Sequence, residues 1–214
     1  MPRYHSDHRV FAHTPKTSTE PPQPFVYMLP LADGRGFKLG RTANLLRRIS
    51  SFSLRYFEDF NLREAPIVRC VTKAQTTELE RILKREAAVR IEPPEWLEWG
   101  VRCPTEWFAA GAARAVRQYV ATLDTDPRYV GVSLETTYDE IRRQLIASEE
   151  YMTTWAMMTW AEISGRTAAR GGHHVSTLLG RQLIASLDAY KWFDMPLLQG
   201  WEPEEEFLAS NRER

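Results

Sequence analysis

Residues 25–40 read FVYMLPLADGRGFKLG, which places two apolar runs on either side of a glycine-rich turn. The first run covers residues 25–29, and the second begins at residue 37. Between them, the Asp-Gly-Arg-Gly sequence at residues 33–36 supplies the backbone freedom that a tight connection between strands requires. The pattern predicts a β-hairpin over residues 25–40.

Helix and strand patterns alternate after the hairpin. Thr42 is a suitable N-cap for a helix whose apolar residues recur at helical spacing through Ile49. Residues 66–71, PIVRCV, predict a third strand, and either Thr72 or Thr76 begins a second helix. A third, alanine-rich helix is expected to follow Trp107 and Phe108 and to run through Leu123.

The predicted fold class is therefore α+β. A β-hairpin plus a third strand, flanked by helices, occupies residues 25–123 and is followed by an all-α C-terminal domain. Residues 1–24 predict a flexible arm, because they are rich in proline and poor in aliphatic side chains. Asp-Thr-Asp-Pro begins a predicted linker at residues 124–135, and residues 136–214 read as a helical accessory domain.

The hexapeptide Arg-Gln-Leu-Ile-Ala-Ser occurs twice in the helical part, at residues 143–148 and 181–186. A tyrosine and a tryptophan follow each copy. We interpret the two copies as similar core helices that pack against each other, related by an old duplication.

Composition excludes several classes of protein. The chain has 214 residues, of which 43% are hydrophobic and 26% charged, so it can bury a core. It contains no apolar run of the roughly 18 residues that a membrane helix needs. The residues near its N-terminus also lack the apolar run of a secretory signal peptide, so we do not expect one. Two cysteines give neither a disulfide framework nor a metal motif, so we expect a reduced, cytoplasmic protein.

The net charge of zero hides an asymmetry along the chain. Residues 25–120 hold 16 basic and 11 acidic side chains, whereas residues 121–214 hold 9 basic and 15 acidic ones. Six cations and no acid lie between Gly34 and Phe57, which predicts a positive surface for phosphates or, alternatively, a solvated basic face. These cations are Arg35, Lys38, Arg41, Arg47, Arg48 and Arg55.

Four motifs over about residues 25–110 together resemble the GIY-YIG nuclease superfamily. They are Tyr27 within Phe-Val-Tyr, Lys-Leu-Gly at residues 38–40, the RTANLLRR sequence at residues 41–48, and a later helix that carries Glu80. Glu-Trp-Phe at residues 106–108 resembles the sequence that closes the domain in a phage-type subgroup. The chain departs from the family in having Phe-Val-Tyr for Gly-Ile-Tyr and lysine for the second tyrosine. A lysine in that motif is similar to the same subgroup.

This resemblance implies a metal-dependent endonuclease that hydrolyses phosphodiester bonds, with DNA as the expected partner. Glu80 would hold Mg²⁺ or Mn²⁺, because one carboxylate and several waters suffice for such an ion. Arg48 would bind the scissile phosphate, and Tyr27 would orient or deprotonate the attacking water. Lys38 would lower the pKa of Tyr27 or contact phosphate itself.

Three further arginines, Arg35, Arg41 and Arg47, are predicted to contact the nucleic acid rather than to take part in the chemistry. Each residue of the site also has a plainer interpretation. Tyr27 fits a core aromatic, Glu80 a helix-surface ion pair, and Arg48 beside Arg47 a solvated pair.

Two other functions stay open at this point. The second interpretation after the nuclease is a catalytically weak or inactive nucleic-acid-binding module whose helical domain recruits a protein partner. Alternatively, it is an assembly component with tryptophan-rich helices as its interface. The helical domain is also a candidate for forming a homodimer.

Overall fold

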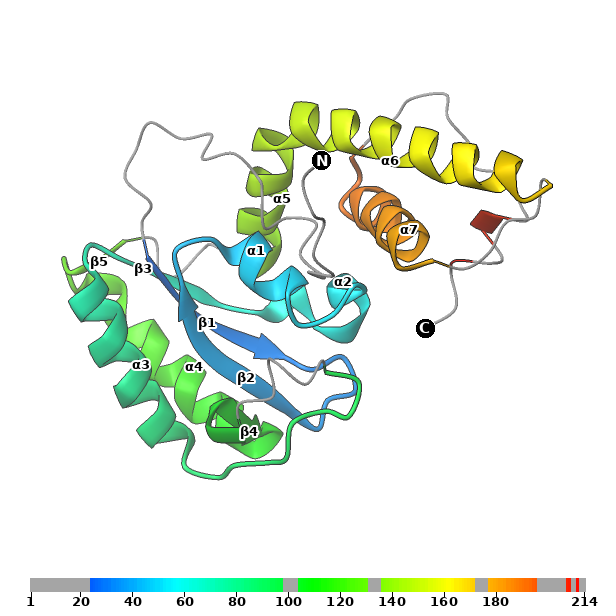
Figure 1. The fold of residues 1–214 in the computed structure, drawn as a ribbon. Coiled ribbons are helices and arrows are strands. Elements are labelled where there is room, and N and C mark those ends of the chain that lie inside the picture. The colour runs from blue at the N-terminus through cyan, green and yellow to red at the C-terminus, as the bar shows by residue number, and fades with distance from the viewer. Residues whose placement is uncertain are drawn as a thin grey trace. The chain divides into compact units, whose positions relative to one another are not determined.

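The computed structural model describes residues 24–97, 104–130, 136–171, 177–195, 207–208 and 211 (Figure 1). The chain divides into two compact units, and the boundary lies between Arg143 and Gln144. The predicted arm, apart from Pro24, lies outside the described residues.

A five-stranded antiparallel sheet forms the centre of the first unit, in the order β4-β2-β1-β3-β5. The predicted hairpin and third strand are confirmed, and so is the α+β class. The strands are β1 (Phe25–Pro30), β2 (Gly36–Thr42), β3 (Ile67–Cys70), β4 (Trp107–Ala109) and β5 (Tyr129–Val130).

Helices cover both faces of this sheet, with α1 and α2 on one face and α3 and α4 on the other (Figure 1). Short 3₁₀ turns connect several of these elements. The helices are α1 (Leu45–Ser50), α2 (Tyr56–Asp59), α3 (Lys73–Ala87) and α4 (Ala113–Thr122), and the turns are η2 (Leu62–Glu64), η4 (Pro104–Glu106), η5 (Ala110–Ala112) and η6 (Leu123–Thr125).

The alternation of side chains along β1 separates two environments. Val26 and Met28 pack with Leu79 and Leu83 of α3 in one buried cluster. Because successive strand side chains point to opposite faces, Tyr27 points to the other face, which α1 and α2 cover. The alternation along β1 therefore directs the Tyr27 side chain toward α1, the helix that carries two adjacent arginines.

Two strands were missed by the sequence prediction. The predicted helix after Trp107 begins only at Ala113, because Trp107 and Phe108 instead form β4 against β2, where the rings of Phe37 and Phe108 stack 5.8 Å apart. Within the predicted linker, Tyr129 is buried and pairs with Cys70, so this segment adds β5 to the sheet.

One helix cap was also predicted wrongly. Asn44, not Thr42, caps α1, since its side chain accepts a hydrogen bond of 2.8 Å from the backbone N–H of Arg47. The hydroxyl of Thr42 instead closes the preceding turn through the backbone of Asn44. At α3, Thr72 is confirmed as the N-cap and forms a capping box with Gln75.

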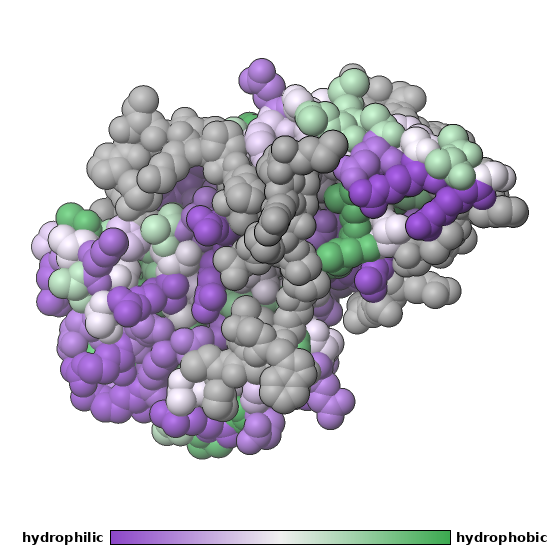
Figure 2. Space-filling view, viewed as in Figure 1, coloured by the Kyte–Doolittle hydropathy of each residue, from purple (hydrophilic) through white to green (hydrophobic). Residues whose placement is uncertain are grey.

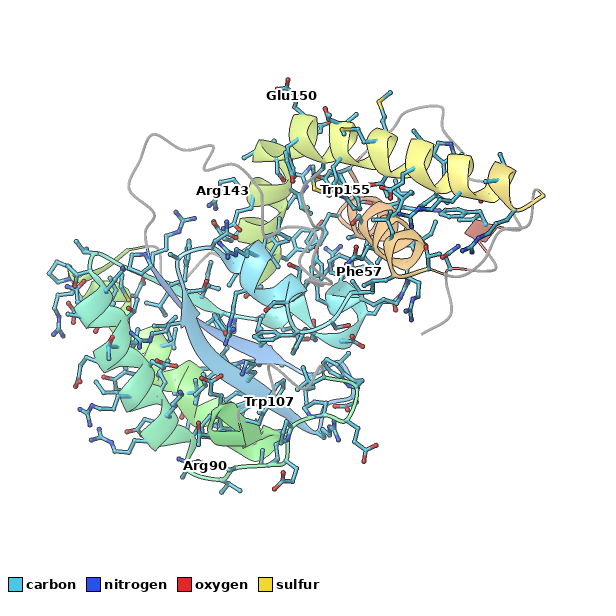
Figure 3. All side chains as sticks on the ribbon, viewed as in Figure 1. Phe57, Arg90, Trp107, Arg143, Glu150 and Trp155 are labelled. Atoms are coloured by element: carbon cyan, nitrogen blue, oxygen red, sulfur yellow. The ribbon has the colours of Figure 1, made fainter. Side chains whose placement is uncertain are left out.

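The chain after β5 is mostly helical, with α5 (Thr137–Ala147), α6 (Glu149–Ala169) and α7 (Leu178–Trp192). Trp155 and Trp160 of α6 pack on a buried cluster that includes Leu183 of α7 and Phe207; Figure 3 shows Trp155 beside these helices. Within the described residues, no helix combines the length and hydrophobicity that crossing a membrane requires.

Candidate functional site

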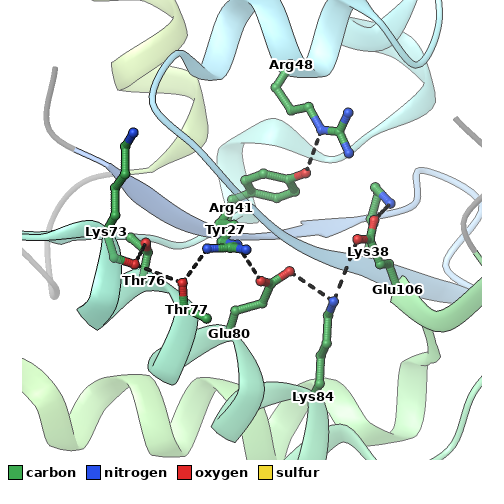
Figure 4. A network of polar contacts seen from close by, with 10 residues as sticks. All are labelled: Tyr27, Lys38, Arg41, Arg48, Lys73, Thr76, Thr77, Glu80, Lys84 and Glu106. Atoms are coloured by element: carbon green, nitrogen blue, oxygen red, sulfur yellow. Dashed lines mark hydrogen bonds and ion pairs between the residues drawn. The ribbon is translucent and has the colours of Figure 1, made fainter.

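The fourth strand leaves part of the sheet edge open. β4 pairs only with the start of β2, at Gly36–Lys38, so among the described strands residues 39–42 have no partner on that side. Polar side chains from strands, helices and the η4 turn gather beside this open edge (Figure 4). We call six of them the edge network: Lys38, Glu106, Lys84, Glu80, Arg41 and Thr77.

Tyr27 and Gly40 are cross-strand partners, and their contact explains the glycine of the Lys-Leu-Gly motif. The phenol ring of Tyr27 lies over the backbone of Gly40. A β-carbon at position 40 would overlap the ring and its hydroxyl group. Glycine is thus required here by the tyrosine rather than by backbone conformation.

Arg48 reaches the same tyrosine from α1. Its Nε donates a hydrogen bond of 3.4 Å to the Tyr27 hydroxyl, and its guanidinium lies 4.9 Å from the centre of the Phe52 ring. Burial raises the pKa of Tyr27 above its ordinary value, and the charge of Arg48 only partly opposes this. The phenol is therefore protonated near neutral pH, which favours the predicted orienting role over proton abstraction.

Lys38 occupies a different position from the one predicted. Its side chain is fully buried, and its ammonium lies 2.5 Å from Glu106 Oε2 and about 5 Å from the ring centres of Phe52 and Trp107. Arg48, not Lys38, is the cation that lowers the pKa of Tyr27. The reason is β4, which brings Trp107 and the neighbouring Glu106 against Lys38.

Glu106 is kept ionised by its surroundings. Burial alone would raise the pKa of its carboxyl group. The positive charges of Lys38, Lys84 and Arg48 outweigh that effect and hold the pKa below its usual value. Lys38 and Glu106 therefore form a charged pair within the folded unit at neutral pH.

Glu80 projects from α3 toward the open edge and is held by two cations (Figure 4). Its Oε2 lies 2.9 Å from Arg41 Nε, and its Oε1 lies 2.9 Å from Lys84 Nζ. Lys84 also approaches Glu106, at 3.7 Å. The helix-surface ion pair that the sequence offered as an alternative is therefore present, but it belongs to a network that also includes strand residues.

The remaining predicted cations are dispersed. Arg35 lies in the hairpin turn and pairs with Asp33, roughly 20 Å along the strand from Arg41. Arg55 pairs with Glu58, whereas Arg47 is exposed on α1 beside Arg48. The positive surface is weaker than predicted, because most of these cations meet acids from outside residues 34–57. Hydrophilic side chains of both signs gather over α3 instead (Figure 2).

Of the two remaining residues in this site, sequence reasoning indicated the first and missed the second. Lys84 follows Glu80 by one helical turn, so the spacing alone indicated that the two could pair. Glu106 appeared only as part of Glu-Trp-Phe, and its contact with Lys38 spans 68 positions of sequence. No local signal indicates such a contact.

A divalent metal fits this site only through Glu80. Among the described residues, no group of three or more His, Cys, Asp or Glu side chains is arranged to hold a metal. Mg²⁺, however, is commonly bound through one or two carboxylates, with water and substrate phosphate completing its shell. Glu80 supplies such a carboxylate at the open edge, provided that one of its two cationic partners releases the carboxylate oxygen to which it is bound.

Comparisons of the chain with protein-family models, with curated proteins and with solved structures find no match. A functional assignment therefore rests on the residues and their geometry.

Proposed function

We propose that the chain is a metal-dependent endonuclease of the GIY-YIG kind that hydrolyses phosphodiester bonds, with DNA as its expected substrate. The observation that carries this proposal is the convergence at one open sheet edge of Tyr27, Arg48 and Glu80, which come from β1, α1 and α3. Arg48 donates a hydrogen bond to the Tyr27 hydroxyl, and Glu80 lies close enough for its charge to add to the rise in the pKa of Tyr27.

In this proposal Arg48 binds the scissile phosphate and stabilises the negative charge that grows on it during hydrolysis. Tyr27 stays protonated and orients the attacking water or a phosphate oxygen. Glu80 would hold Mg²⁺ or Mn²⁺, which when bound neutralises phosphate charge and promotes ionisation of water.

The other basic residues have supporting roles in the proposed enzyme. Arg41 and Arg47 contact the backbone near the site, and Arg35 contacts it farther along. Lys38, although it stands where the family resemblance suggests a second tyrosine, holds the site together through Glu106 and does not itself touch phosphate.

A nucleic-acid-binding module is the second candidate, and one observation favours it. Both oxygens of Glu80 are neutralised by the chain's own cations, so the carboxylate would not repel a bound backbone even without a metal. Cleavage assays separate these two functions.

For the helical unit we propose contact with a protein partner or with a second copy of the chain, and for the whole protein a cytoplasmic location. Met157 and Met158 of α6 support the first part, because both side chains are largely exposed. Methionine is common at adaptable binding surfaces.

The nuclease proposal is tested with supercoiled plasmid in the presence of Mg²⁺, Mn²⁺ or EDTA. Nicking by the wild type should require metal and should be lost in Glu80→Gln. It should be kept in Glu78→Gln, a matched control two residues away whose carboxylate pairs with Arg81. Metal-independent DNA binding without any cleavage would instead support the binding module.

A further inference from the structure

We propose that Arg41 is an electrostatic switch for Glu80. In the free protein, its guanidinium forms an ion pair with the carboxylate that would bind the metal. When nucleic acid binds, the guanidinium moves to a backbone phosphate. This inference rests on the proposed function, because it assumes that Glu80 holds a divalent metal. It adds that binding of metal and binding of nucleic acid are coupled through one side chain.

The contacts of Arg41 suit an exchangeable partner. Its Nε lies 2.9 Å from Glu80 Oε2, and its Nη1 donates a hydrogen bond to the hydroxyl of Thr77. Thr77 lies on α3 one turn before Glu80, so helix geometry sets the hydroxyl and the carboxylate side by side. Together they orient the guanidinium across Glu80.

Exposure determines which of the two cations on Glu80 can leave. The Arg41 side chain is 47% exposed and stands on the part of β2 that β4 does not cover. The Lys84 side chain is 25% exposed and is shared between Glu80 and Glu106. The Glu80 side chain is only 12% exposed, so it is the Arg41 side of this pair that solvent and phosphate can reach, and a phosphate can compete there for the guanidinium.

The chemistry of the two partners favours transfer in one direction. A guanidinium binds phosphate through parallel N–H donors at least as well as it binds a carboxylate. Once Arg41 has moved, Glu80 loses a positive neighbour that opposes the approach of a divalent cation. Metal is then held most tightly where a substrate backbone is already in place.

The expected coupling is moderate. An exposed ion pair is worth up to about 1 kcal/mol, which corresponds to roughly fivefold in a binding constant. Releasing Glu80 from Arg41 should therefore tighten metal binding by about two- to fivefold. By linkage, metal should strengthen nucleic-acid binding by the same factor that nucleic acid strengthens metal binding.

The experiment titrates the full-length protein with Mn²⁺ in the absence of nucleic acid and measures free Mn²⁺ by electron paramagnetic resonance. Arg41→Ala should bind Mn²⁺ about two- to fivefold more tightly than the wild type. Arg81→Ala is the matched control, because it removes an exposed cation beside Glu80 in sequence that pairs with Glu78 instead. Its Mn²⁺ affinity should equal that of the wild type.

A second variant separates the switch from a general effect of charge. Thr77→Val keeps every charge but removes the hydroxyl that orients Arg41. It should also tighten Mn²⁺ binding, by about twofold, while leaving the affinity for a DNA duplex unchanged by fluorescence anisotropy. Arg41→Ala should weaken DNA binding and lower its salt dependence by about one phosphate contact.

The possible failures are distinguishable. Equal Mn²⁺ affinities for the wild type, Arg41→Ala and Thr77→Val would overturn the switch and leave the nuclease proposal standing. Equal Mn²⁺ affinities for the wild type and Glu80→Gln would show that Glu80 does not bind the metal. That result would overturn both proposals. Thermal unfolding of each variant, compared with the wild type, identifies any change that arises from loss of fold.

Discussion

The two ends of the edge network contain the same kinds of charge in very different surroundings. At one end, Lys38 is fully buried against Glu106 at 2.5 Å, between aromatic rings. At the other end, Arg41 is half exposed and meets Glu80 at 2.9 Å beside the uncovered edge of β2. Lys84 contacts both carboxylates and joins the two ends.

The two carboxylates are similarly buried, with Glu106 17% and Glu80 12% exposed, so the burial of the cation is what distinguishes the two ion pairs. A buried pair is costly to break, since the charge left behind has no water to solvate it. An exposed pair exchanges its partner for solvent or ligand at little cost. We therefore assign Lys38 and Glu106 to the architecture of the site, and we propose that the pair of Arg41 and Glu80 exchanges partners when ligands bind.

Breaking the buried end should have the largest effect. Glu106→Gln leaves the Lys38 ammonium without its counter-ion, and we expect the free energy of unfolding to fall by about 3–5 kcal/mol in urea denaturation. The double variant Lys38→Met/Glu106→Gln should recover part of this loss, because the buried charge is then absent. A loss below about 1 kcal/mol in the single variant would contradict the structural assignment.

Removing the proposed phosphate-binding cation should affect cleavage rather than stability. Arg48→Met keeps packing against Phe52 but loses the charge, so the rate of plasmid nicking should fall about 10²- to 10³-fold, equivalent to about 2.7–4 kcal/mol. Arg55→Met is a suitable control, because Arg55 pairs with Glu58 away from the site. Equal nicking by Arg48→Met and wild type would remove Arg48 from the proposed machinery.

The contact between Tyr27 and Gly40 is tested by adding a single methyl group. Gly40→Ala should lower the free energy of unfolding by about 1–3 kcal/mol, because the new β-carbon overlaps the phenol ring. A β-carbon at Gly111 meets no neighbouring atom, so Gly111→Ala serves as the control and should change stability by less. Similar unfolding curves for the two variants would show that the ring does not constrain position 40.

The smallest effect concerns pH. Because the pKa of Glu106 is lowered in the folded state, its ionisation stabilises the fold fully above the unfolded value, about pH 4.3, and this contribution is lost as the pH falls through the folded pKa. The difference in unfolding free energy between wild type and Glu106→Gln should therefore narrow below about pH 4. A difference that stays constant from pH 7 to pH 3 would contradict the lowered pKa.

Local patterns were enough to predict the part of the site that depends on local geometry. The hairpin itself follows from two apolar runs and a glycine turn, but its register, which pairs Tyr27 with Gly40 and Leu29 with Lys38, could not be read from the sequence. Helical spacing from Thr72 placed Leu79 and Leu83 in the core. Glu80, the next residue after Leu79, then lies at the margin of the buried face.

Contacts over long sequence distances were not predictable in the same way. β4 has three residues and no periodic pattern, so nothing in the sequence indicated that it would bring Glu106 to Lys38. The error at Thr42 was smaller and of a different kind. Both Thr42 and Asn44 are good capping residues, and only the backbone decides between them.

The repeated hexapeptide shows how far context overrides sequence. In the copy at residues 143–148, Arg143, Ile146 and Ala147 are exposed near the end of α5. In the copy at residues 181–186, every side chain from Gln182 to Ser186 is buried within α7. Both copies contribute core residues, and the hydroxyl of Tyr190 in α7 donates a hydrogen bond to the Leu145 carbonyl in α5, but the two copies differ in how much of each is buried.

The most direct test of the exchangeable end is a crystal structure of the full-length protein grown with Mn²⁺, using anomalous scattering to locate the metal. The account predicts an anomalous peak at the carboxylate of Glu80, with Arg41 moved off Oε2 and the Lys38–Glu106 pair unchanged. A structure in which Mn²⁺ binds elsewhere, while Arg41 and Lys84 still hold Glu80, would contradict it.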